Sequence, residues 1–227
     1  MKKCSVVLVF AVGLLLAVPS FAQIDIGVVG GLNIANLSGE EPDGDKIDFS
    51  SRMAFGAGVV IDIHLTKCLS FRLKPSYLQT GAKQDMSDEI DNAEAEYKST
   101  YLEIPLLLKY TFNAGDAQPY LLAGPSIGLE LDTKVEIKMG SQGVELQGFE
   151  NMIKSTNLSL MFGAGLNVPM ESMNFFIEGR YSLGISDIFE GGTMNIPGAG
   201  IQELADADIK TSGIMIMGGF TFPLFGK

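Results

Sequence analysis

Apolar and polar residues alternate along most of the chain that follows residue 22. In the clearest stretch, every second residue from Leu102 to Phe112 is apolar, and Glu103 and Lys109 stand among the residues between them. A period of two places the two sets on opposite faces of a β-strand. The pattern therefore predicts strands, and no run of apolar residues beyond residue 22 is long enough to indicate a spanning helix.

The same alternation recurs in eight segments. The predicted strands are residues 23–35, 52–65, 67–81, 97–112, 118–139, 155–168, 173–186 and 209–225. Most are longer than strands of soluble sheets. A strand needs about 9–11 residues to cross a bilayer, and these segments meet that length.

The connections between these segments are short and long in turn. The short ones lie near Thr66 and at 113–117 and 169–172, and the long ones at 36–51, 82–96, 140–154 and 187–208. This is typical of outer-membrane barrels, which have short periplasmic turns and longer extracellular loops. The sequence therefore predicts an all-β fold: a single antiparallel up-and-down transmembrane β-barrel of about eight strands. Because 118–139 is longer than a bilayer requires, we expect it to end in a protruding hairpin with its turn at 140–143.

The polar face of the predicted strands carries the candidate functional residues. They are predicted to form a charge network in the lumen, made of Asp25, Asp62, His64, Arg72, Lys74, Glu103, Lys109, Glu178 and Arg180. Eight strands leave an interior just wide enough for side chains, so paired charges there predict a plugged barrel. Two alternatives stay open: a narrow channel for ions or small solutes, with the same charges as a selectivity ring, and a soluble lipocalin-like barrel with an apolar, ligand-binding interior.

The first 22 residues read as a secretory signal peptide. Lys2 and Lys3 precede an apolar stretch from Val6 to Val18, and the small residues Ser20 and Ala22 follow it. This order predicts cleavage near Ala22 and a mature barrel domain over 23–227. A membrane anchor is the alternative, although the apolar stretch is short for a spanning helix.

Charge and composition narrow the candidate partners. The formal net charge is −11, which argues against nucleic acid as a partner because binding phosphates requires clustered Lys and Arg. Most acidic residues fall in or beside the long connections, above all at 40–48 and 85–96, and we expect these loops to be solvated and mutually repelling. Weak Ca²⁺ binding at 40–48 is the alternative, without the spacing of an EF-hand.

Residues suited to chemistry are scarce. His64 is the only histidine, and it shares a strand face with Asp62 without a nucleophile in a recognisable context. We therefore interpret it as a hydrogen-bonding lumen residue near the short-turn end. Once the signal peptide is removed, Cys68 is the only cysteine and forms no intramolecular disulfide or cysteine-rich metal site. The sequence predicts no catalytic, cofactor or metal site, and a protein that is not an enzyme.

Four motifs carry a family resemblance. They are Gly30 to Asn33 (GGLN), Tyr101 to Tyr110 (YLEIPLLLKY), Tyr120 to Pro125 (YLLAGP) and Glu178 to Ile188 (EGRYSLGISDI). In this order they resemble the small porin-family outer-membrane β-barrel proteins, the outer membrane protein beta-barrel domain. The resemblance covers essentially the whole mature chain.

The resemblance implies a protein of the Gram-negative outer membrane, surrounded by lipid and inserted by the barrel-insertion machinery. It also implies a structural or interaction role, in which the loops meet an extracellular or membrane partner. One feature departs from the family pattern. Such barrels usually end on an aromatic residue, whereas Gly226 and Lys227 follow Phe225 here.

Overall fold

The computed structural model describes residues 23–40, 46–47, 49–85, 93–112, 115–139, 142–146, 152–196, 200–204 and 208–225. The predicted signal peptide, residues 1–22, lies outside these described residues, as does most of the segment considered for Ca²⁺. No helix in the described part of the chain is long and apolar enough to cross a membrane.

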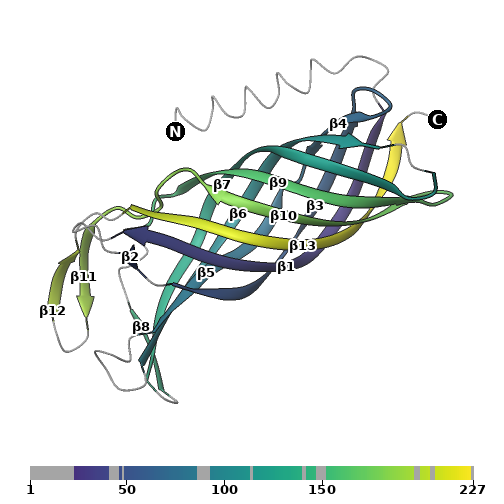
Figure 1. Cartoon of the computed structure of the whole chain (residues 1–227). Helices are drawn as coiled ribbons and strands as arrows, with labels where there is room; N and C mark the ends of the chain where they lie inside the picture. Colours follow the sequence, from purple (N-terminus) through teal and green to yellow (C-terminus); the bar gives the residue numbers. More distant parts are fainter. Residues whose placement is uncertain are drawn as a thin grey trace.

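Eight antiparallel strands form the barrel, in agreement with the predicted segments. They are β1 (Ile24–Glu40), β3 (Ser50–His64), the consecutive pieces β4 (Leu69–Leu73) and β5 (Ser76–Asp85), β6 (Ala93–Thr111), β7 (Gln118–Met139), β9 (Thr156–Pro169), β10 (Asn174–Gly184) and β13 (Asp208–Phe225). Each strand pairs with its neighbour in the chain, as the alternating pattern predicted, and Figure 1 shows them side by side in a tilted barrel.

The barrel closes because the first and last strands pair. β1 pairs β3 on one side and β13 on the other, and the second ladder runs from Ile24 opposite Phe225 to Glu40 opposite Asp208. Closure gives every strand two neighbours, so no edge faces lipid unpaired. The described part of the last strand ends at Phe225, and Gly226 and Lys227, which depart from the usual aromatic end, lie outside the described residues.

The faces of the strands are arranged as a lipid environment requires. The alternating apolar residues point outward and are exposed, among them Phe55, Leu108, Phe162, Ile177 and Ile216. The polar residues between them are buried inside the barrel. The arrangement is the reverse of a soluble lipocalin-like barrel, so that alternative is wrong.

The third barrel strand is interrupted where the sequence places Lys74 and Pro75. Proline has no N–H to donate to a ladder, and β4 ends at Leu73 while β5 begins at Ser76. Further along, the β3–β5 ladder shifts register between Ser51 and Gly56. Lumen side chains bond to the backbone there: Asn33 Nδ2 donates to the carbonyl of Gln79 at 2.9 Å, and Arg52 Nη1 to that of Thr80 at 3.2 Å.

The end with the long connections contains more regular structure than the sequence predicted. β1, β5 and β6 extend into the segments 36–51 and 82–96, which were expected to be loops. Short strands also lie at this end (Figure 1): β2 (Lys46–Ile47), β8 (Gln142–Leu146), β11 (Gly192–Ile196) and β12 (Gly200–Leu204). The predicted protruding hairpin is confirmed, because β8 pairs with the end of β7 from Met139 opposite Gln142 onward.

Candidate functional site in the barrel lumen

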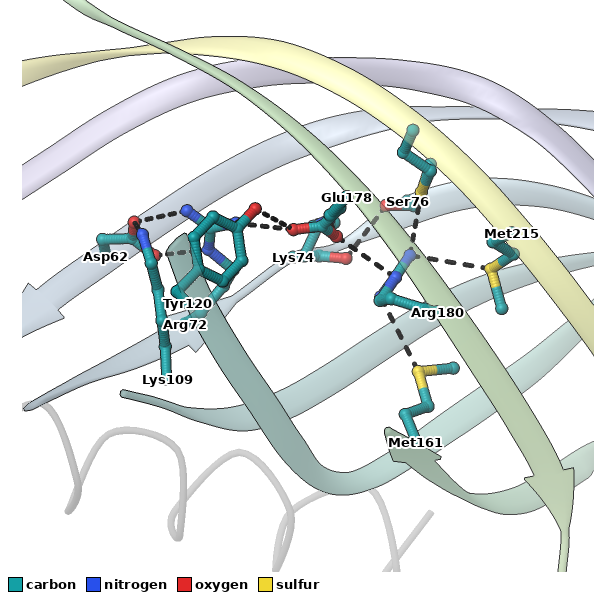
Figure 2. A network of polar contacts seen from close by, with 11 residues as sticks. Asp62, Arg72, Lys74, Ser76, Lys109, Tyr120, Met161, Glu178, Arg180 and Met215 are labelled. Carbon is teal, nitrogen blue, oxygen red and sulfur yellow. Dashed lines mark hydrogen bonds and ion pairs between the residues drawn. The ribbon is translucent and has the colours of Figure 1, made fainter. Parts of the chain in front are cut away.

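A belt of buried ionic groups crosses the lumen near the short-turn end. We define the charge belt as Asp62, Arg72, Lys74, Lys109, Tyr120, Glu178 and Arg180, which Figure 2 shows close together. They come from β3, β4, β6, β7 and β10, except Lys74, which lies in the break between β4 and β5. All seven lie within a few residues of the short turns or on the inward face just above them. Every one of them is buried.

Arg72 is the centre of the belt. Its Nε and Nη2 donate to the two carboxylate oxygens of Asp62 at 2.7 and 2.6 Å, and its Nη1 donates to Glu178 Oε2 at 2.7 Å. Asp62 lies on the neighbouring strand β3, whereas Glu178 lies on β10, four strands away in either direction around the barrel. The Arg72–Glu178 ion pair therefore spans the lumen from wall to wall.

The carboxylates of Asp62 and Glu178 accept further hydrogen bonds from other members of the belt. Lys109 Nζ donates to Asp62 Oδ2 at 3.1 Å, and Lys74 donates to Glu178 Oε1. The Tyr120 hydroxyl donates to Glu178 Oε2 at 2.9 Å. Sequence reasoning missed Tyr120 as a lumen residue, although it shares the inward parity of Leu122 on β7. Its ring also lies beside the cations, 4.5 Å from Lys109 Nζ, which adds a cation–π attraction.

Arg180 has weaker partners than Arg72. Its Nε approaches Glu178 Oε1 at 3.2 Å without hydrogen-bond geometry. Its Nη atoms contact three methionine sulfurs: Met161 at 3.7 Å, Met215 at 3.6 Å and Met217 at 2.9 Å. A thioether is a weak acceptor, so this guanidinium gains less from its surroundings than Arg72 does.

Three of the nine predicted residues lie outside the belt. Asp25 and His64 form a pair of their own at the short-turn end, with His64 Nε2 3.0 Å from Asp25 Oδ2. Glu103 is buried higher in the lumen, and no described residue bonds to its Oε2. Glu103 and Lys109 share one face of β6, but Lys109 binds Asp62 and not Glu103. The period of two gave the inward face of each residue and not its height along the barrel.

Apolar side chains fill the opposite end of the lumen. Inward-facing Val135 packs with Met152 and Phe189 from the long connections, and Leu37 and Ala82 pack with Ile188. Asp187 holds this segment in place, because its Oδ1 accepts the backbone N–H groups of Phe189 and Ile209. The described lumen thus has its charge belt near the short turns and two apolar clusters near the long connections.

A second ionic cluster lies on β3, β6 and β7 toward the long connections, beyond the band of exposed apolar residues. Glu96 accepts from Arg52 Nε at 3.0 Å and from Lys138 Nζ at 2.5 Å, and Lys98 Nζ bonds Glu136 at 2.7 Å. The prediction that residues 85–96 form a solvated, self-repelling loop is therefore wrong for its described part. In the β6–β7 ladder, Glu96 lies diagonal to Lys138, and Glu136 lies diagonal to Lys98.

This cluster makes stability depend on pH. Partial burial alone would raise the pKa of Glu96, but hydrogen bonds from Lys138 and Arg52 lower it from 4.5 to about 2. A lowered pKa means that Glu96 stabilises the fold above pH 4.5 and loses this contribution as the pH falls toward 2. In Glu96→Gln, we expect the urea midpoint to change less over that interval than in the wild type.

The partners of Glu96 provide the control for that measurement. Arg52→Gln and Lys138→Gln each remove one donor, so each should flatten the same part of the pH profile by less than Glu96→Gln does. A profile of Glu96→Gln that overlays the wild-type profile between pH 4.5 and pH 2 would show that this carboxylate contributes nothing.

Comparison with known proteins identifies the family. The model of the outer membrane protein beta-barrel domain matches residues 21–190. The chain belongs to this family. It is therefore a bacterial outer-membrane β-barrel protein, as the four motifs implied, and the lipid surrounds the exposed apolar band. No curated protein matches the sequence.

One solved outer-membrane protein shares the fold of this family member, and two further solved structures are similar to it over most of the chain. OprG from Pseudomonas aeruginosa is 16% identical with a TM-score of 0.57, over 91% of this chain and 98% of its own. Neisserial surface protein A is 13% identical over 88% of this chain and 96% of its own, with a TM-score of 0.44. Ail of Yersinia pestis, in complex with the heparin analogue sucrose octasulfate, is 16% identical over 88% and 99%, with a TM-score of 0.42.

Proposed function

We propose that this protein has a structural or interaction role in the outer membrane and that paired charges plug its lumen. The observation that carries the proposal is the Arg72–Glu178 ion pair across the barrel, with every partner buried. Ions that passed this point would have to displace hydrogen bonds whose loss leaves a charge unpaired in a narrow interior. The apolar packing of Met152, Ile188 and Phe189 adds a second obstacle.

The remaining elements of the role follow from location. The signal peptide directs export and is cleaved near Ala22, and the barrel-insertion machinery places residues 23–227 in the membrane. With transport blocked, the acidic connections at the long-loop end are the part of the chain available to an extracellular or membrane protein partner. Among the chemistry-bearing groups, His64 contacts Asp25, an arrangement that supports a lumen role rather than an enzyme.

Single-channel recording tests the plug. Protein refolded from residues 23–227 and shown to be folded should leave a planar bilayer silent. The double variant Glu178→Ala with Arg180→Ala removes two opposite charges from the belt, and we expect it to be less stable and to open a leak. The matched control, Lys98→Ala with Glu136→Ala, removes an ion pair outside the lumen and should stay silent.

Discrete conductance steps from the wild type would contradict the plug. If the Glu178 and Arg180 substitutions then changed only ion preference, the belt would be the selectivity ring of a narrow channel. That result would replace the structural role by transport of ions or small solutes.

A further inference from the structure

Gln23 becomes the first residue of the mature chain if the signal peptide is cleaved after Ala22, and the structure fixes it on the wall of the barrel. Its carbonyl accepts a hydrogen bond from the backbone N–H of His64 at 2.9 Å, directly before β1 begins at Ile24. The new terminus is therefore held at the short-turn end of the barrel. The inference below rests on the cleavage site proposed above, which places the free α-amine on Gln23.

The side chain of Gln23 contacts an acid–imidazole pair that takes no part in the plug. Gln23 Nε2 donates to Asp25 Oδ1 at 3.3 Å, and Asp25 Oδ2 lies 3.0 Å from His64 Nε2. Asp25 is buried, whereas Gln23 is exposed and the His64 side chain is 31% exposed. A carboxamide is thus held beside two groups that can exchange protons, at a place that water reaches.

An N-terminal glutamine carries a nucleophile and an electrophile in the same residue. Its α-amine can attack Cδ of its own side chain, which closes a five-membered lactam. An α-amino group titrates at roughly pH 8, so part of it is the unprotonated nucleophile at neutral pH. The carboxamide nitrogen is a poor leaving group until it is protonated, and a positioned acid–base pair accelerates such a proton transfer.

We propose that Gln23 is a modification site that cyclises to pyroglutamate, with Asp25 and His64 as the pair that transfers the proton. A bond forms between the Gln23 backbone nitrogen and Cδ, and the bond between Cδ and Nε2 breaks. The proton that the amine loses passes through the pair to Nε2, which leaves as ammonia. The reaction needs no oxidant, reductant or co-reactant, and it occurs once on the protein's own chain, so it does not make the protein an enzyme.

Cyclisation changes the chemistry at the start of the strand that closes the barrel. The lactam nitrogen has no charge and is no longer a free amine, so an aminopeptidase has no starting point before β1. The carbonyl of Gln23 takes no part in the reaction, and its hydrogen bond from the His64 N–H is kept.

Mass spectrometry of the protein purified from outer membranes tests the modification. We expect an N-terminal peptide that begins at residue 23 and is lighter by one ammonia than the same peptide with an unmodified glutamine. A chain that begins at another residue would overturn the cleavage after Ala22 and this proposal together. A chain that begins with unmodified Gln23 would leave the cleavage site standing and overturn the cyclisation alone.

The rate of cyclisation tests the part played by Asp25 and His64. The full barrel is refolded with a protease site directly before Gln23, cleaved, and divided between buffer and urea, and the loss of ammonia is followed by mass. We expect the folded chain to react about tenfold faster or more than the unfolded chain, and Asp25→Asn or His64→Gln to remove this advantage. Asp116→Asn, which changes an exposed acid in another short turn, should keep it. Equal rates in buffer and urea would overturn the role of the pair.

Discussion

Arg72→Met should cost this barrel about 3–5 kcal/mol of its free energy of unfolding. The substitution preserves much of the side-chain volume but removes four hydrogen bonds, two to Asp62, one to Glu178 and one to the Tyr120 hydroxyl. Both carboxylates stay buried, and each loses its shortest arginine contact. The midpoint of urea unfolding, followed by the mobility difference between folded and boiled protein on a gel, measures the loss.

Arg52→Met is the matched control for this prediction. Arg52 also binds a carboxylate, that of Glu96, but Arg52 is less buried than Arg72 and Glu96 keeps its hydrogen bond from Lys138, so we expect a smaller loss of stability. Adding Asp62→Asn to Arg72→Met should recover part of the stability, because it removes a charge that has lost its main partner. If Arg72→Met and Arg52→Met lose the same free energy of unfolding, burial does not make the ion pairs of the belt more important for stability.

Gly27→Ala should prevent normal closure of the barrel. A Cβ on Gly27 would lie 1.8 Å from the backbone carbonyl oxygen of Phe220 in the β1–β13 ladder. A backbone atom cannot move away without breaking that ladder, so we expect a loss of about 3 kcal/mol or failure to fold. The yield of the compact, heat-sensitive gel band after refolding measures the effect.

Gly30→Ala isolates the cause of that failure. Gly30 lies three residues further along the same strand, and the nearest atom to a Cβ there would be the carbonyl oxygen of Gly56, at 3.7 Å. This is an ordinary contact, so Gly30→Ala should refold like the wild type. If both variants refold equally well, close approach at Gly27 does not constrain the seam.

The sequence predicted strands and faces well because both follow from local alternation. The segment 97–112 corresponds to β6 (Ala93–Thr111), and Glu103 and Lys109 lie inside as expected. A side-chain period of two reports which face a residue occupies. It carries no information beyond the strand itself, so the break at Pro75 and the extension of β5 and β6 above the membrane were not predicted.

Ion-pair partners were harder to predict because they depend on the stagger of the strands. Arg72 and Glu178 are distant in sequence and meet only when the tilt and register of a closed barrel bring them to one height. For the same reason Glu103 shares a face with Lys109 but not a partner. The inward position of Tyr120 could have been predicted from the alternation along β7, whereas the three methionine contacts of Arg180 could not.

Pairing of Ile24 with Phe225 also has a consequence for biosynthesis. β1 and β13, the two strands whose pairing closes the barrel, are the first and the last barrel strands to be synthesised. Closure therefore depends on the contacts with the largest sequence separation. Until they meet, β1 and β13 each present a row of unsatisfied N–H and C=O groups, which invites pairing with another chain. The nascent protein must therefore be kept apart from its own copies all the way to the membrane.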